Sequence, residues 1–167
     1  FHMAARADVR FSSDSPGEVF EQNVAGTFNV VDAARRNKVK RIVFASTGSI
    51  YGEPEWFPTP EDAPFPIQTS IYGASKLAGE GLLHAFAESF GIQVFIFRFV
   101  SNVGERYTHG HIFDFYKKLS VNPESLDVLG NGLQRKSYVY VGDTVEAIMI
   151  ALEKANEKVN VFNVGTD

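Results

Sequence analysis

The segment IQVFIFRF, residues Ile92 to Phe99, constrains the fold more than any other stretch of the chain. Its apolar residues fall on both faces of an extended strand, which is typical of a parallel strand that helices cover on both sides. Two similar short segments occur at residues 41–46 (RIVFAS) and 160–164 (NVFNV). Helical patterns separate the three segments, and this alternation predicts an α/β domain built on a doubly wound parallel sheet.

Two long helices are expected between these strands. The first begins at Ser15, where Pro16 and Glu18 indicate a proline in the first turn and a capping box, and it ends near Asn37. Its expected apolar face consists of Phe20, Val24, Phe28 and Val31. The second runs from about Ser70 to Phe90 and ends at Gly91. The other expected elements are a helix over 111–119, a short strand near 127–129, a turn at 130–132, a strand over 137–141, and a helix capped by Asp143 with Glu146 in the boxed position.

The composition is that of a globular protein and excludes several function classes. Apolar residues make up 44% and charged residues 22%, and the net charge of −4 gives no electrostatic reason to expect nucleic acid as a partner. The most apolar run, residues 94–100, is far shorter than the roughly 20 residues of a membrane span, so no membrane partner is expected. The absence of cysteine fits a reducing compartment, and we expect a cytoplasmic protein.

The stretch IYGASKLAGE places Tyr72 and Lys76 four residues apart at the start of the second long helix. On a helix this spacing puts the two side chains on one face, with Cβ atoms roughly 5–6 Å apart. A phenol has an ordinary pKa of about 10, and a nearby ammonium group lowers it by favouring the phenolate. Reaching a pKa of about 7 takes about 4 kcal/mol, which requires a second positive charge alongside. The pair is therefore either a general base for an alcohol or an ordinary exposed lysine beside an interfacial tyrosine.

The segment FASTGSIYGEP, residues 44–54, adds a cluster of small hydroxyl residues at the end of a strand. The carboxyl ends of parallel strands are where open α/β sheets bind ligands. The alternative is that these hydroxyl groups only bond to free backbone groups at the strand end.

Together the two segments resemble the extended short-chain dehydrogenase/reductase family, and within it the NAD-dependent nucleotide-sugar epimerases of the UDP-glucose 4-epimerase kind. In that pattern a Ser or Thr stands four positions before the tyrosine of a VYG-like tripeptide, as Thr47 stands before Tyr51 in Ile50-Tyr51-Gly52. Tyr72 follows Thr47 by 25 positions, which is the spacing of the family's catalytic tyrosine. The resemblance extends over the whole chain through the segments HMAARADV, EQNVAGTFNVVDAA, RFVSNVGERYTHGHIFDF, LDVLGNGLQRKSYVYVGD and VFNVG.

The resemblance implies a catalytic set of Thr47, Tyr72 and Lys76. Tyr72 would remove a proton from a sugar hydroxyl while the sugar carbon passes a hydride to NAD, and return of the hydride to the other face would invert that carbon. Thr47 would hydrogen-bond to the reacting oxygen, and Lys76 would bind the nicotinamide ribose and lower the pKa of Tyr72. The implied contacts to NAD are Met3, Ala4, Ala5, Arg6, Ala7, Gln22, Thr47, Tyr72, Lys76 and Val100. The implied contacts to the nucleotide sugar, a UDP-hexose, are Thr47, Tyr72, Ser101, His109, His111, Ile112, Val128, Leu129 and Lys136.

Several positions depart from the usual pattern of this family. The family usually has Asn where Gln22 and Ser101 stand, and Arg where Lys136 stands; a lysine keeps the charge but loses the bidentate geometry. Dehydratases of the family carry an acidic residue directly after the Thr, where this chain has Gly48 and Ser49. The lack of such a residue favours epimerisation, with a dehydratase or reductase of the same family as the alternatives.

The glycine-rich turn that receives the pyrophosphate in this family does not occur in the chain. We therefore expect residues 1–167 to form a partial NAD(P)-binding Rossmann-like domain that lacks the first strands and most of the small substrate domain, with part of the substrate region around 105–136. The activity of this chain alone stays open, and a non-catalytic interaction domain is the alternative of a different class.

Two further expectations concern partners and metals. In relatives the two long helices pair across a twofold axis, so the resemblance implies a homodimer through helices 15–36 and 70–90. His109 and His111 are two potential metal ligands, but a zinc site needs a third, so no metal is expected.

Overall fold

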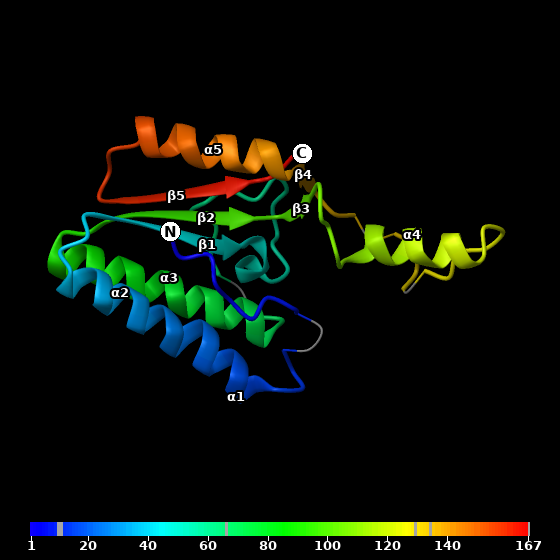
Figure 1. The fold of residues 1–167 in the computed structure, drawn as a ribbon, viewed down its shortest axis with the longest axis horizontal. Helices are drawn as coiled ribbons and strands as arrows, with labels where there is room; N and C mark the ends of the chain where they lie inside the picture. The colour runs from blue at the N-terminus through cyan, green and yellow to red at the C-terminus, as the bar shows by residue number, and fades with distance from the viewer. Residues whose placement is uncertain (10–11, 66, 129, 134, 167) are drawn as a thin grey trace.

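A parallel sheet forms the centre of the molecule, in a computed structural model that describes residues 1–9, 12–65, 67–128, 130–133 and 135–166. Its strand order is β1 (Arg41–Thr47), β2 (Gln93–Phe99) and β5 (Val159–Val164), and all pairs are parallel. His2 extends the sheet by an isolated parallel bridge to Phe44 of β1. Helices α2 and α3 lie on one face of the sheet and α5 on the other (Figure 1). The prediction of a doubly wound parallel α/β sheet is therefore confirmed.

The first helical segment buries a different set of residues from the set that the sequence predicts. It consists of α1 (Pro16–Val19), a π-helical turn (Phe20–Ala25) and α2 (Gly26–Arg36). A π turn holds more residues than an α turn, and the buried residues accordingly recur at every fourth position: Val19, Asn23, Thr27 and Val31. The predicted apolar face was therefore wrong at Phe20 and Phe28, which are 57% and 45% exposed, while Val24 is half-buried and Val31 is buried.

The predicted capping box at the start of this segment was also wrong. The Ser15 side chain makes no capping hydrogen bond. Glu18 instead forms an ion pair with Arg6 at 3.1 Å, which ties the helix to the segment that follows His2. The end of the helix at Asn37 is confirmed.

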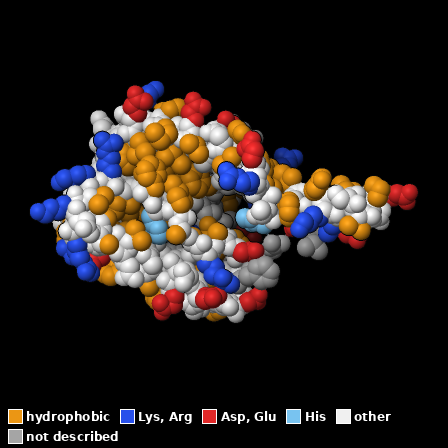
Figure 2. Space-filling model, viewed as in Figure 1, with side chains coloured by type: hydrophobic (Ala, Val, Ile, Leu, Met, Phe, Trp, Pro, Cys, Tyr) orange, Lys and Arg blue, Asp and Glu red, His pale blue; other side chains and the backbone are white. Residues whose placement is uncertain are grey.

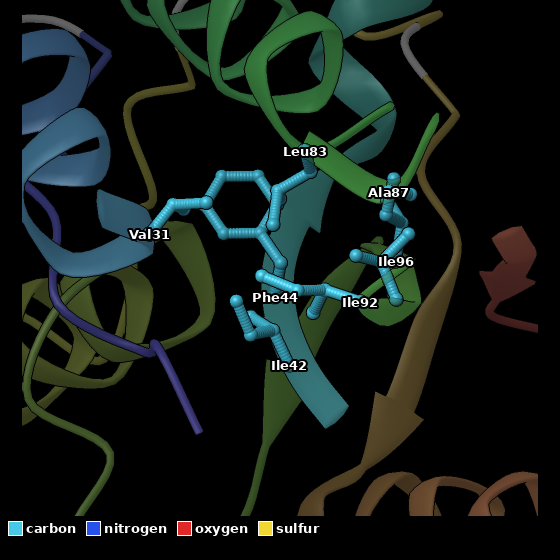
Figure 3. Packing of buried hydrophobic residues seen from close by; sticks show 8 residues of the cluster. Val31, Ile42, Phe44, Leu83, Ala87, Ile92 and Ile96 are labelled. Carbon is cyan, nitrogen blue, oxygen red and sulfur yellow. The ribbon is translucent and has the colours of Figure 1, made fainter. Parts of the chain in front are cut away.

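Helix α3 (Ile71–Phe90) has the boundaries that its sequence signals predict. The Ser70 hydroxyl accepts a hydrogen bond from the Gly73 amide at 2.9 Å, and Gly91 ends the helix in a left-handed conformation with φ of 67°. The helix packs on the sheet over an apolar cluster with Phe44 at its centre (Figure 3). A Cβ atom on Gly79 would lie 2.8 Å from the Phe44 ring, so only glycine allows this close approach.

Helix α5 (Val141–Lys154) covers part of the opposite face of the sheet. It begins at Val141 and has no side-chain cap, so the prediction that Asp143 caps it was wrong; Asp143 lies in the first turn. In the view of Figure 2, hydrophobic side chains gather on the surface over the region of α5 and β5. Met149 and Val145 of α5 are among the exposed hydrophobic residues.

The segment between β2 and α5 lies outside the three-stranded sheet. A short strand β3 (Ser101–Val103), which the sequence did not predict, pairs in parallel with β4 (Tyr138–Tyr140). Between them, α4 (His111–Val121) extends away from the sheet (Figure 1). The predicted strand near 127–129 was wrong for Asp127 and Val128, which are irregular, while Leu129 lies outside the described residues. Among the helices described, none has the length and apolar character to cross a membrane.

Candidate active site

Thr47 and the start of α3 meet at the carboxyl end of β1. Thr47 is the last residue of β1, and a 3₁₀ turn (Gly48–Tyr51) follows it. The Thr47 hydroxyl accepts a hydrogen bond from the Ser49 amide at 3.1 Å. Tyr72 lies in the first turn of α3 and Lys76 one turn later, so both side chains start from the part of α3 nearest to this strand end.

Gly73 sets the distance between α3 and the turn after Thr47. A Cβ atom at this position would lie 2.8 Å from the carbonyl oxygen of Ser49 and 3.0 Å from the Ser70 hydroxyl. The Ser49 oxygen belongs to the backbone and cannot rotate away. Any larger residue at position 73 therefore pushes the start of α3, and Tyr72 with it, away from Thr47.

We expect Gly73→Ala to lower the free energy of unfolding by about 1–3 kcal/mol, the usual cost of forcing an extra methyl group into a packed site. Urea unfolding followed by circular dichroism measures the change. Gly81→Ala is the matched control, because it lies on the same helix and a Cβ atom there meets nothing within 4 Å. Its expected effect is neutral or stabilising by up to about 1 kcal/mol. Equal effects of the two substitutions would contradict the close packing at Gly73.

The electrostatic environment of Tyr72 keeps it a neutral phenol in this chain. Burial raises the pKa of Tyr72 above its ordinary value, and a side-chain hydrogen bond with Thr47 acts in the opposite direction. The interaction places the Thr47 hydroxyl beside the Tyr72 phenol. Because burial is the larger effect, a phenolate at neutral pH requires additional positive charge next to Tyr72.

Lys76 is a buried ammonium group, with only 2% of the residue exposed. Its Nζ lies 4.0 Å from the centre of the Phe44 ring, a cation–π contact. Burial lowers the pKa of Lys76 to about 8, although the negative charge of Glu80 opposes this shift. Among the described residues, no carboxylate forms an ion pair with Lys76. A lysine placed in this way has N–H donors to offer to a ligand, and it fits the hydroxyl groups of a ribose.

Asn23 is a site residue that the sequence analysis missed. Its Oδ1 accepts a hydrogen bond from the Arg6 amide at 2.7 Å, and its Nδ2 donates to the Arg6 carbonyl at 3.1 Å and to the Ser75 hydroxyl at 2.9 Å. Ser75 in turn donates to the carbonyl of Tyr72 at 2.7 Å. Asn23 thus connects the segment after His2 to the turn of α3 that carries Tyr72 and Lys76. The sequence does space Asn23 four positions from Val19 and from Thr27, which are also buried. This four-residue spacing indicates a buried face only once the π turn is known, and the sequence did not predict that turn.

The other residues predicted to contact a dinucleotide differ in exposure. Met3, Ala4, Ala5, Arg6 and Ala7 form an exposed segment directly after the bridge of His2 to the sheet. Gln22 is exposed beside the buried Asn23, and Val100 is half-buried at the end of β2. The residues 3–7 lie at the same edge of the sheet as Thr47, since His2 and Phe44 run in parallel.

The residues predicted to contact a sugar nucleotide are spread over two regions. Ser101 begins β3, two residues after β2 ends, and is half-buried. Five others lie on or beside the α4 region: His109, His111, Ile112, Val128 and Lys136. His111 contacts the Tyr138 hydroxyl, while Lys136 is exposed. Leu129 lies outside the described residues. Helix α4 extends away from the sheet and from α3, the helix that carries Tyr72 (Figure 1).

Two other features of the molecule do not belong to this cluster. The part of the chain that the structure describes contains no group of three His, Cys, Asp or Glu side chains that could hold a metal ion. A groove of about 730 Å³ lies between α5 and β5, on the other side of the sheet from α3, and its lining includes Phe97, Ala147 and Phe162 but none of Thr47, Tyr72 and Lys76.

Comparison with known proteins identifies relatives of the chain over nearly its whole length. A putative UDP-glucose 4-epimerase of Methanocaldococcus jannaschii is 37% identical over 166 residues, which cover 96% of this chain and 53% of the relative. The crystal structure of a UDP-galactose 4-epimerase superimposes with a TM-score of 0.89 at 41% identity, over 99% of this chain and 55% of that chain. A UDP-glucuronic acid 4-epimerase from Bacillus cereus, solved with UDP-glucuronic acid and NAD, gives 0.88 at 29% identity, over 100% and 53%.

The chain therefore spans about half the length of the relatives that it matches. The family model for the NAD dependent epimerase/dehydratase family matches residues 1–165. This match covers the parallel sheet, α3 and the cluster of Thr47, Tyr72 and Lys76, and the chain belongs to the NAD dependent epimerase/dehydratase family.

Proposed function

We propose that the protein epimerises a nucleotide sugar of the UDP-hexose type with NAD as cofactor. The observation that carries this proposal is the side-chain hydrogen bond between Thr47 and Tyr72 at the carboxyl end of β1. Lys76 follows Tyr72 by one turn of α3, is buried, and is paired to no described carboxylate. Relatives named as UDP-sugar 4-epimerases, one of them solved with NAD, support the substrate class and the cofactor. Since the chain spans about half of their length, the proposal concerns the whole protein.

In the proposed mechanism Tyr72 is the general base that takes the proton of a sugar hydroxyl at its phenolic oxygen. The Thr47 hydroxyl beside it hydrogen-bonds to the same sugar oxygen and orients it. Lys76 would hold the ribose hydroxyls of the cofactor. The additional positive charge that a Tyr72 phenolate requires would come from the oxidised cofactor when it is bound. When bound, NAD would supply the acceptor for a hydride from the sugar carbon and the donor that returns it to the opposite face. Tyr72 then gives the proton back to the sugar oxygen.

The remaining contacts follow from their places in the fold. The exposed backbone of residues 3–7 lies at the ligand-binding edge of the sheet, and with Val100 it is proposed to line the dinucleotide. Gln22 is included as a contact at the rim of the site. Ser101 is proposed to contact the sugar nucleotide near Tyr72, and the α4 region to close over the nucleotide end through His109, His111, Ile112, Val128, Leu129 and Lys136.

The turn after Thr47 favours epimerisation over dehydration. Elimination of water needs an acid in addition to the base, and dehydratases of this family place it directly after the Thr. In this chain Gly48 and Ser49 occupy those places, and the Thr47 hydroxyl donates to the Ser49 hydroxyl at 3.2 Å. No proton donor of the strength of a carboxylic acid is therefore offered by this turn.

A turnover assay of the whole protein with UDP-glucose, UDP-N-acetylglucosamine and UDP-glucuronic acid, followed by NMR of the sugar, tests this function. We expect one of these to be converted to its 4-epimer without loss of water. A 4-keto sugar formed with loss of water would establish a dehydratase instead. Release of free reduced cofactor with each turnover would establish a dehydrogenase.

We also propose that the protein is a homodimer through the helices over 15–36 and 70–90. Phe20 and Phe28 are exposed on the outer side of α2 and its π turn, and Phe28 packs edge-on against Phe86 of α3, with ring centres 6.1 Å apart. Exposed aromatic residues on two neighbouring helices are typical of an interface between subunits.

Sedimentation of the whole protein at micromolar concentration is expected to show a dimer, and Phe28→Glu is expected to make it a monomer by placing a charge in the interface. Phe57→Glu is the control, because Phe57 is also exposed but lies on the loop before α3. A monomeric unsubstituted protein, or equal effects of the two substitutions, would count against this interface.

A further inference from the structure

A buried ion pair joins α3 to β2 next to the candidate active site. Arg98 Nη2 donates to Glu80 Oε2 at 2.8 Å, and Arg98 Nε lies 3.2 and 3.3 Å from the two carboxylate oxygens. The two side chains are only 4% and 3% exposed. A buried ion pair adds little net stability, because removing both charges from water costs about as much as their attraction returns. Its presence therefore points to a role other than stability.

The position of Glu80 connects the pair to Lys76 and Thr47. Glu80 follows Lys76 by one turn on α3, so both side chains lie on the same side of the helix. The Ser46 hydroxyl donates to Glu80 Oε1, and Ser46 directly precedes Thr47 at the end of β1. Ser46 and Arg98 are also register partners in the sheet. One carboxylate thus ties the turn of α3 after Lys76 to the ends of both β1 and β2.

Arg98 extends the same connection to the segment between β1 and α3. Its Nη1 donates to the Tyr51 hydroxyl at 2.6 Å and to the Glu61 carbonyl at 2.7 Å. Tyr51 in turn donates to Asn163 of β5 at 2.8 Å. The turn after Thr47 and the segment at Glu61 are therefore held by the same Arg98 side chain that holds Glu80.

The charged groups around Lys76 differ in sign. On its own helix, Tyr72, a neutral phenol, lies one turn before Lys76 and Glu80 one turn after it. The charged group of β2 is Arg98, which forms an ion pair with Glu80. From the segment before β1, Lys76 faces His2, whose pKa is lowered by burial and by the charge of Lys76 itself, so that it is neutral at pH 7. Of these described groups, Glu80 is the one that stabilises the Lys76 ammonium.

We propose that Glu80 is a positioning residue for Lys76: held by Arg98 and Ser46, its carboxylate stabilises the ammonium group one turn away on α3. The link from Lys76 to the cofactor rests on the proposed function; the link from Glu80 to Lys76 does not. Glu80 itself touches neither cofactor nor substrate in the proposed mechanism.

The test is an NMR titration of the chain with ¹³C-labelled lysine, in which the Lys76 signal is identified by its absence from Lys76→Met. In Glu80→Gln the pKa of Lys76 is expected to fall from about 8 by one unit or more, a loss of at least about tenfold in proton affinity. Glu88→Gln is the matched control, because Glu88 lies on the same helix and pairs with Lys158 at the surface. Its expected effect on Lys76 is nil. An unchanged Lys76 pKa in a folded Glu80→Gln variant would overturn the proposal.

A second variant covers the case in which Glu80→Gln leaves Arg98 unpaired and the chain unfolds. Glu80→Gln combined with Arg98→Met removes both charges, and the pKa of Lys76 is again expected to fall, since Glu80 and not Arg98 is the charge that raises it. A pKa unchanged from that of the unsubstituted chain would overturn the proposal.

The effect of Glu80→Gln on NAD binding distinguishes a failure of this proposal from a failure of the proposed function. In the whole protein, Glu80→Gln is expected to weaken NAD binding at pH 8 by about fivefold or more, in line with the loss of protonated Lys76. The binding is expected to recover at pH 6, where most of Lys76 is protonated again when its pKa falls by one unit. Weakening to the same extent at both pH values would indicate a merely structural role and overturn the proposal. Failure of the unsubstituted protein to bind NAD would contradict the proposed function and leave the Lys76 titration as the test of Glu80.

Discussion

Lys76→Met is expected to make the folded chain more stable at pH 7 while weakening its binding of NAD. Burial lowers the pKa of Lys76 from 10.5 to about 8 on folding, so Lys76 is still charged at pH 7. Keeping this charge buried lowers the free energy of unfolding. The shift of about 2.5 units corresponds to at most about 3 kcal/mol, from which the contact with the Phe44 ring subtracts part. Methionine fills a similar space without the charge. The gain in the free energy of unfolding is therefore expected to be about 1–3 kcal/mol.

The pH dependence of this difference has a defined sign. Between pH 8 and 10.5 the unfolded chain holds the Lys76 proton more tightly than the folded chain does. The free energy of unfolding of the unsubstituted chain therefore rises with pH through this window relative to that of Lys76→Met, and the gain of the variant disappears. Urea unfolding of both chains at pH 7 and at about pH 10 measures the change.

Lys117→Met is the control, because Lys117 is an exposed lysine whose Nζ also lies over a phenylalanine ring, 4.5 Å from its centre. Its expected effect is within about 0.5 kcal/mol at either pH. In the whole protein, calorimetric titration is expected to show NAD binding weakened about 10- to 100-fold by Lys76→Met, the loss of charge-assisted hydrogen bonds, and unchanged by Lys117→Met. A destabilised Lys76→Met chain with unchanged NAD affinity would contradict the proposed role of Lys76.

Tyr72→Phe is expected to remove nearly all epimerisation from the whole protein without unfolding it. The substitution removes one hydroxyl group from a half-buried ring and leaves its packing in place. If Tyr72 is the general base, kcat should fall by about 10²- to 10⁴-fold. Tyr116→Phe is the matched control, since Tyr116 is 70% exposed on α4. Retention of activity in a folded Tyr72→Phe protein would eliminate Tyr72 as the base.

The sequence predicts best those elements whose signals are local. Ser70, the apolar core positions and Gly91 define α3 within a residue, because a cap, a periodicity and a left-handed glycine all lie within the helix itself. Likewise β1 and β2 are each found within a residue, since both are short apolar runs with buried faces. The Tyr72 and Lys76 pair is visible for the same reason, because its spacing is that of one helical turn.

What the sequence could not predict depends on contacts between distant segments. The π turn rotates the first helix so that Asn23, and not the predicted apolar face, points inward. In the sequence, Arg98 is a single charged residue in an apolar run, and no local pattern predicts its partner. The structure pairs it with Glu80, 18 residues away. No local sequence pattern predicts the direction in which α4 extends from the sheet. A common sugar-nucleotide site formed by Ser101 and the residues of the α4 region therefore stays a proposal.

The most direct test of the proposed hydride mechanism is to run the conversion of the UDP-hexose substrate by the whole protein in D₂O and to examine the product by NMR. We expect an inverted sugar that carries no deuterium from the solvent, because the hydrogen removed from the carbon is returned to the same molecule while Tyr72 exchanges only the hydroxyl proton. Deuterium at the inverted carbon would show that a solvent-exchanging base removes the hydrogen as a proton, and it would contradict the proposed roles of Thr47, Tyr72 and Lys76.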